Sequence, residues 1–256
     1  MAQPVFPPVP QAVPRLRETA GIQAARILDS CGDRDCLEDL QVFFPAREQE
    51  IVNSGAAVSA RYAEAVRADS KIEPQSFRPG YYNVDITYYF LIHFSVSLTA
   101  GAPAEVAGHA YHQKRYTLFG GESGIKTFIS SDTGKGAAAA PVSVVQVSDP
   151  VALSAVITER APAYSEAPDN IPAQAAGYFA DIGLPTPDTV KKTVLATIGL
   201  FSVVSLTRDS ALLMPVYDYA LPERYCPSTR ADPGEIFNRI GFPFERFYPE
   251  NINRRR

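Results

Sequence analysis

The chain has 256 residues, of which 46% are hydrophobic and 11% aromatic, enough for the core of one large β-domain or two smaller ones. A formal net charge of -4 and a pI near 5.5 provide no basic excess to neutralise a phosphate backbone, so we expect no nucleic-acid partner. The sequence also lacks an apolar run of the roughly 20 residues that a membrane span requires, and its first residues lack the pattern of a signal peptide. We therefore expect synthesis in the cytoplasm without a signal peptide and no membrane span.

Five prolines lie within residues 1–14 and alternate with apolar side chains. Proline fixes the backbone and removes an amide donor, which favours an extended polyproline conformation and opposes a helix. We predict an extended Pro-rich arm over residues 1–20 that docks in a groove on a neighbouring subunit. Docking on its own domain and a free tail are the alternative interpretations. The apolar residues of the arm are Val5, Phe6, Val9 and Val13.

The first 45 residues are predicted to form an entry segment with a short helix and a first strand. Residues 17–30 favour a short helix, and residues 31–44 are expected to turn through Gly32 into a first strand at residues 40–44. Residues 56–66 fit a helix or a strand, and the β context downstream makes us prefer the strand.

Residues 82–98 carry the strongest strand signal in the chain. Every even position is apolar over nine consecutive alternations, a period that helices do not produce. At about 3.3 Å per residue the strand would span roughly 55 Å, so it either bends across two sheets or runs through a tall sandwich. The even positions are Tyr82, Val84, Ile86, Tyr88, Phe90, Ile92, Phe94, Val96 and Leu98.

Further strands are predicted downstream. Residues 107–119 and 125–130 flank a glycine-rich turn and suggest a hairpin in which glycines supply positive φ. Residues 142–147 and 152–157 are shorter strands, whereas the Pro- and Ala-rich residues 159–187 suggest a surface excursion.

The last predicted strands surround a charged turn. Residues 193–206 are apolar at both parities, as in a strand buried on both faces. Residues 208–210 are expected to turn into a return strand at residues 211–219, where Pro215 favours a sheet edge or a bulge. Residues 233–240 suggest one short helix.

These elements predict a mainly β protein with few short helices. The architecture would be an antiparallel β-sandwich or two related β-units, preceded by the extended Pro-rich arm. The corresponding domain boundaries are 1–20 for the arm, 21–158 for a first β-unit, 159–190 for the excursion, and 191–256 for a second β-unit with its C-terminal tail.

The residues capable of chemistry do not form a recognisable catalytic or metal-binding pattern. His109 and His112 are three apart, so a strand directs them to opposite faces. Cys31 and Cys36 fit neither a redox pair nor a zinc site, which leaves reduced thiols or a disulfide open, as for Cys226. An acidic cluster at residues 33–39 lacks the spacing of a calcium loop and suggests a solvated turn. We therefore expect no enzymatic activity, no cofactor, and no catalytic or metal-binding residue.

Surplus aromatic and apolar residues are better candidates for contacts between subunits. Tyr89 and Leu91 stand out because they lie on the otherwise polar odd face of the strand at residues 82–98. The candidate assembly contacts are Val5, Phe6, Val9, Val13, Phe77, Tyr81, Tyr89, Leu91, Phe244, Phe247 and Tyr248.

Several segments are similar to uncharacterised proteins of spore-forming, clostridial-type bacteria, over most of residues 28–250. The similar segments are CGDRDCLEDL with Val42, EP at 73–74, FRPGYYNVD at 77–85, LFGGESG at 118–124, VSDPVAL at 147–153, TIGLF at 197–201 and PVYDY at 215–219. The resemblance implies a coat, appendage or other envelope component of a sporulating cell. Members of that group often carry a cysteine-rich central segment, which residues 159–187 here lack, and this puts a covalent cross-linking role in doubt.

The sequence thus favours a non-enzymatic, self-assembling structural protein, a spore-associated coat, appendage or filament subunit that forms homo-oligomers through its N-terminal arm. Such a protein would be deposited on the spore or cell surface. The alternative is a monomeric β-sandwich that acts as a binding or adaptor module for an envelope component or a carbohydrate.

Overall fold

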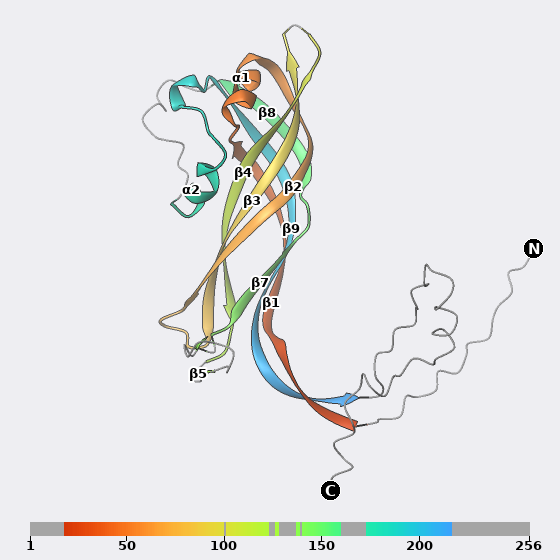
Figure 1. Ribbon diagram of the computed structural model, residues 1–256, viewed down its shortest axis with the longest axis vertical. Helices are drawn as coiled ribbons and strands as arrows, with labels where there is room; N and C mark the ends of the chain where they lie inside the picture. The colour runs from red at the N-terminus through yellow and green to blue at the C-terminus, as the bar shows by residue number, and fades with distance from the viewer. Residues whose placement is uncertain are drawn as a thin grey trace, which may run out of the picture. The chain divides into compact units, whose positions relative to one another are not determined.

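The computed structural model describes residues 18–99, 101–122, 126–127, 137–138, 140–159 and 173–216. The chain divides into a compact unit at Gly21–Leu212 and a second unit formed by Met1–Ala20 and Leu213–Arg256. Strands dominate the larger unit, which confirms the predicted mainly β class with few helices (Figure 1).

One sheet consists of β2 (Gly55–Pro74), β3 (Tyr81–Leu98) and β4 (Ala104–Phe119), with β3 in the centre. Both ladders are antiparallel. The predicted strand at residues 82–98 is confirmed, and β3 stays paired with β4 from Tyr81 opposite Phe119 to Val96 opposite Ala104. Its length therefore belongs to one tall sheet and does not cross into a second one.

The other sheet has β9 (Lys192–Val216) in its centre. β1 (Glu18–Val42) pairs along one edge of β9, and β7 (Val142–Val147) and β8 (Val151–Glu159) follow each other along the opposite edge. The first residue of β7, Val142, lies opposite Thr207. After Thr207, β9 continues with β1 alone as a two-stranded ribbon within the described part of the sheet.

Three predictions about these long strands were wrong. The described part of the expected helix at residues 17–30 and the expected turn at Gly32 lie inside β1, and the expected turn at residues 208–210 lies inside β9. Alanine and arginine in residues 17–30 favour a helix locally, but from Glu18 on this segment pairs with β9 as a strand. The two segments stabilise each other across the sheet, so local propensity does not decide their conformation.

The hydrophobic core lies between the two sheets. The even-numbered side chains of β3 and β9 point inward, and residues such as Phe90, Ile92 and Ile198 are fully buried. Of the two predicted architectures, the structure is consistent with the β-sandwich. β9 contributes to the same core as β3, so the predicted boundaries near residues 158 and 191 do not separate compact units.

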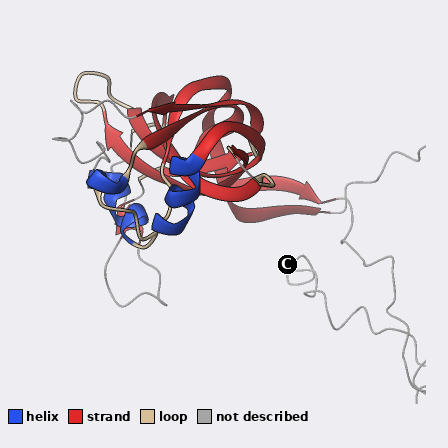
Figure 2. Cartoon of the chain, turned by 90° about the horizontal axis from the view of Figure 1, so that it is seen from above, coloured by secondary structure: helices blue, strands red, loops and turns tan. Residues whose placement is uncertain are grey.

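Two short helices accompany the sheets, and Figure 2 shows them together on one side of the curled strands. α1 (Ala46–Ser54) inserts Val52 into the core, and its Gln49 amide donates a hydrogen bond of 2.9 Å to the Lys192 carbonyl. α2 (Ala173–Ala180) is followed by the short 3-10 helix η2 (Pro187–Thr189). Residues 159–187 were predicted as a surface excursion, but α2 packs tightly against the protein, as described below.

The predicted glycine hairpin is also corrected. β5 (Lys126–Thr127) pairs with β6 (Ala137–Ala138) and not with β4. Gly121 does adopt the predicted positive φ, at 69°, and Gly80 adopts 80° in the turn before β3. The helix predicted at residues 233–240 lies outside the described residues.

Candidate functional site

The outer side of β9 is exposed, which corrects the prediction that this strand is buried on both faces. Its even-numbered residues, such as Val204, point into the core and are fully buried. Its odd-numbered residues point outward, where Phe201 and Val203 stay exposed. A strand with apolar residues at both parities therefore covers the core with one face and offers the other to the surroundings.

The neighbouring strands extend this exposed surface. The antiparallel register places Val144 opposite Ser205 and Val156 opposite Leu195, so these side chains share one side of the sheet. Leu153 sits at a bulge, and one of its methyl groups lies near the outer side of Gly199. We call this surface the apolar face. Its large apolar side chains, 40% to 61% exposed, are Val142, Val144, Val151, Leu153, Val156, Phe201 and Val203.

The apolar face carries no charged side chain at the outward positions of β7 or at those of β9 from Thr193 to Thr207. Two of its hydroxyl groups bind within the sheet, since Ser205 donates to the Val144 carbonyl (3.5 Å) and Thr207 to the Val142 carbonyl (3.4 Å). Covering this surface would thus remove apolar groups from water without stripping solvent from an ion.

A shallow groove of about 570 Å³ crosses β1, β9 and β7 beside the apolar face. Its floor includes Phe201 and Val203, and Gly32 leaves open space where another residue would place a Cβ atom. The guanidinium carbon of Arg34 lies 5.7 Å from the centroid of the Phe201 ring, and Gln146 lines the opposite side. The groove therefore combines an aromatic floor with side chains that donate hydrogen bonds.

The outer face of the other sheet is closed by α2. Tyr89 is completely buried there, with its ring centroid 4.4 Å from that of Tyr178, and Phe43 meets Phe179 at 5.0 Å. Tyr89 was predicted as an assembly contact because it lies on the polar side of β3. The chain covers it with its own helix, so Tyr89 is not available to a neighbouring subunit in this structure.

His109 joins the same cluster. Its Nδ1 lies 2.8 Å from the hydroxyl of Tyr178. Burial lowers the pKa of His109 below its ordinary 6.5 because the charged imidazolium would lose its solvent. The helix therefore packs against a neutral imidazole.

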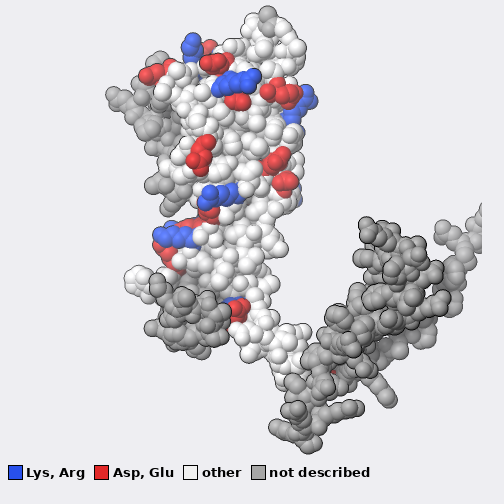
Figure 3. All heavy atoms as spheres, in the orientation of Figure 1, with Lys and Arg blue, Asp and Glu red and all other residues white. Residues whose placement is uncertain are grey.

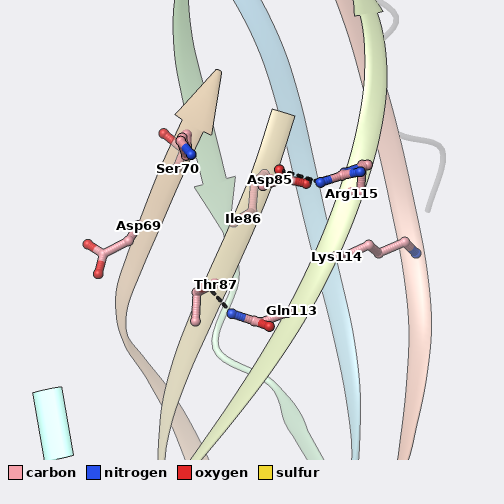
Figure 4. A pocket seen from close by; sticks show the side chains of 9 residues that line it. Asp69, Ser70, Asp85, Ile86, Thr87, Gln113, Lys114 and Arg115 are labelled. Atoms are coloured by element: carbon pink, nitrogen blue, oxygen red, sulfur yellow. Dashed lines mark hydrogen bonds and ion pairs between the residues drawn. The ribbon is translucent and has the colours of Figure 1, made fainter. Parts of the chain in front are cut away.

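Beyond α2 the same outer face is polar, with a groove of about 380 Å³ (Figure 4). Arg115 donates to Asp85, with Nη2 2.8 Å from Oδ2, and Gln113 donates to the Thr87 hydroxyl at 3.2 Å. The hydrogen bond from Arg115 is the main reason why the pKa of Asp85 lies below its ordinary 3.8. In Figure 3 basic and acidic side chains lie next to one another on the visible surface. The polar groups of this groove already bind each other. A polar ligand therefore forms hydrogen bonds here only if it replaces these contacts.

An ionic cluster lies between β1 and β4. The Lys114 ammonium contacts the carboxylates of Asp33 (2.6 Å) and Asp35, and the Tyr116 hydroxyl donates to Asp33 at 2.8 Å. Burial raises the pKa of Asp33, but the hydrogen bonds from Lys114 and Tyr116 outweigh it and hold that pKa below 3.8. The predicted solvated turn at residues 33–39 is thus wrong for these two aspartates, which link the two sheets.

The histidines and cysteines follow the strand geometry. His109 faces α2 on the outside, whereas His112 lies opposite the inward-facing Tyr88, so the prediction of opposite faces is confirmed. Cys31 and Cys36 are both free, one half-buried and the other exposed, on opposite sides of β1. The described residues contain no group of three side chains arranged to hold a metal ion.

The remaining predicted contacts are scattered. Phe77 is 98% exposed in the turn before β3, Leu91 is half-buried, and Tyr81 packs its ring against Phe119 with centroids 5.4 Å apart. The other predicted contacts lie outside the described residues: Val5, Phe6, Val9, Val13, Phe244, Phe247 and Tyr248. Sequence reasoning missed the apolar face, although the apolar outward positions of residues 193–206 were the available signal.

In the part of the chain that the structure describes, every helix is too short or too polar to cross a membrane. Comparison of the chain with known protein families, curated proteins and solved structures found no match.

Proposed function

We propose that this protein is a non-enzymatic structural protein that assembles with copies of itself, as a coat, appendage or filament subunit of a spore or cell surface. The observation that carries the proposal is the apolar face on β7, β8 and β9. The attribution to a spore rests on the sequence resemblance alone.

The apolar face has the composition of an interface core. Exposed valine, leucine and phenylalanine side chains cluster there without charge, and a surface of this kind is rare on proteins that work alone. Each methylene group withdrawn from water contributes about 0.8 kcal/mol to association. The opposite outer face shows what this chain does with apolar residues that it covers itself, since α2 buries Tyr89 there.

A second copy fits the apolar face better than a charged partner does. Two copies bring no like charges together at this surface, and repetition of the same contact builds a closed oligomer or a filament, depending on its symmetry. Arg34 stands at the edge of the face, where solvent still reaches it, as expected for the polar rim of an interface.

The test is the size of the full-length protein in solution. Size-exclusion chromatography with light scattering and negative-stain microscopy should show oligomers that dissociate on dilution. A variant that lacks residues 1–14 should form smaller species, because the predicted arm is lost. If both proteins were monomeric to the same extent at high concentration, self-assembly would be ruled out.

The second candidate function is a monomeric binding or adaptor module for an envelope component or a carbohydrate. The polar groove on β2, β3 and β4 favours it, because Asp69, Asp85 and Gln113 line it from three adjacent strands (Figure 4). This function would be supported in place of assembly if the wild-type protein were monomeric and bound a glycan, and if the Asp69→Ala variant no longer bound it.

A further inference from the structure

We propose that the groove beside the apolar face, lined by Gly32, Arg34, Gln146, Phe201 and Val203, binds the Pro-rich arm, residues 5–13, of a second copy of this chain. The inference rests on the proposed self-assembly and names the two surfaces that meet in it.

The shape of the groove fits an extended apolar segment. The groove has an aromatic floor at Phe201, and the open space at Gly32 lowers its β1 side. Flat, self-complementary packing of two apolar faces would leave such a hollow unfilled. An extended segment with protruding valine and phenylalanine side chains fills it, and aromatic-lined grooves are the usual receptors for proline-rich segments.

The arm and the apolar side of β9 have similar lengths. In a polyproline conformation the eight steps from Val5 to Val13 cover about 25 Å at 3.1 Å per residue. The outward residues of β9 from Leu195 to Val203 span about 26 Å at 3.3 Å per residue. The apolar part of the arm is therefore long enough to fill the groove at Phe201 and Val203 and to continue along the outward side of β9 as far as Leu195.

The hydrogen-bonding groups of the groove complement those of the arm. Residues 1–14 contain no charged side chain, and their prolines have carbonyl oxygens without matching amide donors. Such a segment needs donors from its partner. Arg34 and Gln146 supply them at the two sides of the groove. Arg34 is exposed, so solvent still reaches its charge, and the other charged residue of the lining, Asp33, already binds Lys114.

The connection of the chain favours an arm from another copy. From Gly21 to Arg34 the chain runs as continuous strand, over about 43 Å. The arm precedes this strand, so it would have to double back along β1 to reach the groove of its own subunit. An arm from a second copy meets no such demand.

The experiment uses three variants of the full-length chain. The arm variant carries Phe6→Glu and Val9→Glu, the face variant carries Val203→Glu, and the control carries Val66→Glu. Val66 is a matched control because it is an exposed strand valine like Val203, at 44% and 41% exposure, but lies on β2 in the other sheet. Circular dichroism and thermal melting should show that all of them fold.

The arm and face variants should each dissociate at concentrations at least about tenfold higher than the wild type, since a glutamate is placed into an apolar contact. The control should assemble like the wild type. A mixture of the arm and face variants should form mixed oligomers, detected by native mass spectrometry, because an intact arm then meets an intact groove.

Other outcomes separate the inference from the proposed function. A monomeric wild type would overturn both. Wild-type assembly that survives Val203→Glu would exclude the groove, and assembly lost on Val203→Glu but kept by the arm variant would point to direct packing of two apolar faces. Loss in both variants without mixed oligomers would show that arm and groove are not partners. In these last three cases self-assembly would stand and the inference would fail.

Discussion

The two outer faces of the sandwich differ in what covers them. On the sheet of β2, β3 and β4, aromatic side chains such as Tyr89 lie under α2, and the rest of the face carries paired charges. On the sheet of β1, β9, β7 and β8, residues such as Phe201 and Val203 remain exposed beside a groove. Among the described residues, the chain thus covers one outer face with its own helix and leaves apolar side chains of the other exposed.

The largest expected effect is on the unfolding free energy when phenylalanine is replaced by alanine. The loss should be much greater on the face covered by α2 than on the apolar face. Phe179→Ala removes a ring that is 3% exposed and should destabilise the monomer by about 3 kcal/mol. Phe201→Ala removes a ring that is 46% exposed and should cost less than about 1 kcal/mol. Urea unfolding at dilutions where the protein is monomeric measures both, and equal losses would contradict the comparison.

Of the two outer faces, only the covered one should contribute to the pH dependence of stability near pH 6.5, through His109. Because burial lowers the pKa of His109, the unfolded chain binds this proton more readily than the folded protein. Stability should therefore fall as the pH drops below about 6.5, the ordinary value. His109→Gln should reduce the difference in unfolding free energy between pH 7.5 and pH 5.5. Burial also lowers the pKa of His112, but this residue is present in both the wild type and the His109→Gln variant, so its contribution to the pH dependence is the same in both. Val203→Ala, on the apolar face, should leave the pH dependence unchanged.

The charged part of the covered sheet should contribute little. Asp85→Asn breaks the contact with Arg115, whose side chain is largely exposed, and should cost about 0.5 kcal/mol at low salt. High salt should abolish the difference. Since the pKa of Asp85 is lowered, the contribution exists above pH 3.8 and disappears as the pH falls through the lowered value. A loss of several kcal/mol would show that this surface is structurally essential.

The smallest effect concerns an exposed aromatic residue outside both faces. Phe77→Ala should change the unfolding free energy by less than about 0.5 kcal/mol, because the ring lies almost entirely in solvent. Assembly should also persist, measured by light scattering alongside the wild type. If the oligomers were lost, the turn before β3 would belong to the interface, as the sequence predicted.

The elements that were predicted best are those whose burial repeats every second residue. β3 differs from its predicted range by one residue, and β7 matches residues 142–147. β1 was missed because alanine, arginine and leucine in residues 17–30 are good helix formers, while the strand depends on β9 at the far end of the sequence. Local patterns report local preferences, and β1 owes its conformation to a distant partner.

The candidate site shows the same limit. Apolar residues at both parities of residues 193–206 suggested burial on both faces, but such a pattern does not reveal whether the covering atoms belong to the same chain. Tyr89 posed the opposite problem, since α2 comes from a segment whose prolines suggested a loop. In both cases the residue types were informative, and only the tertiary structure showed which surface stays open.

The pairing of β1 with β9 has a consequence for biosynthesis. β1 is the first described strand and β9 the last, and β9 is the central strand to which β1, β7 and β8 all attach. While the ribosome is still making the chain, the sheet of β2, β3 and β4 has all its strands, but the other sheet lacks its centre. Contacts so distant in sequence form slowly. The sheet that bears the apolar face is therefore completed only after β9 has been made, so this face forms at the same time as the core beneath it.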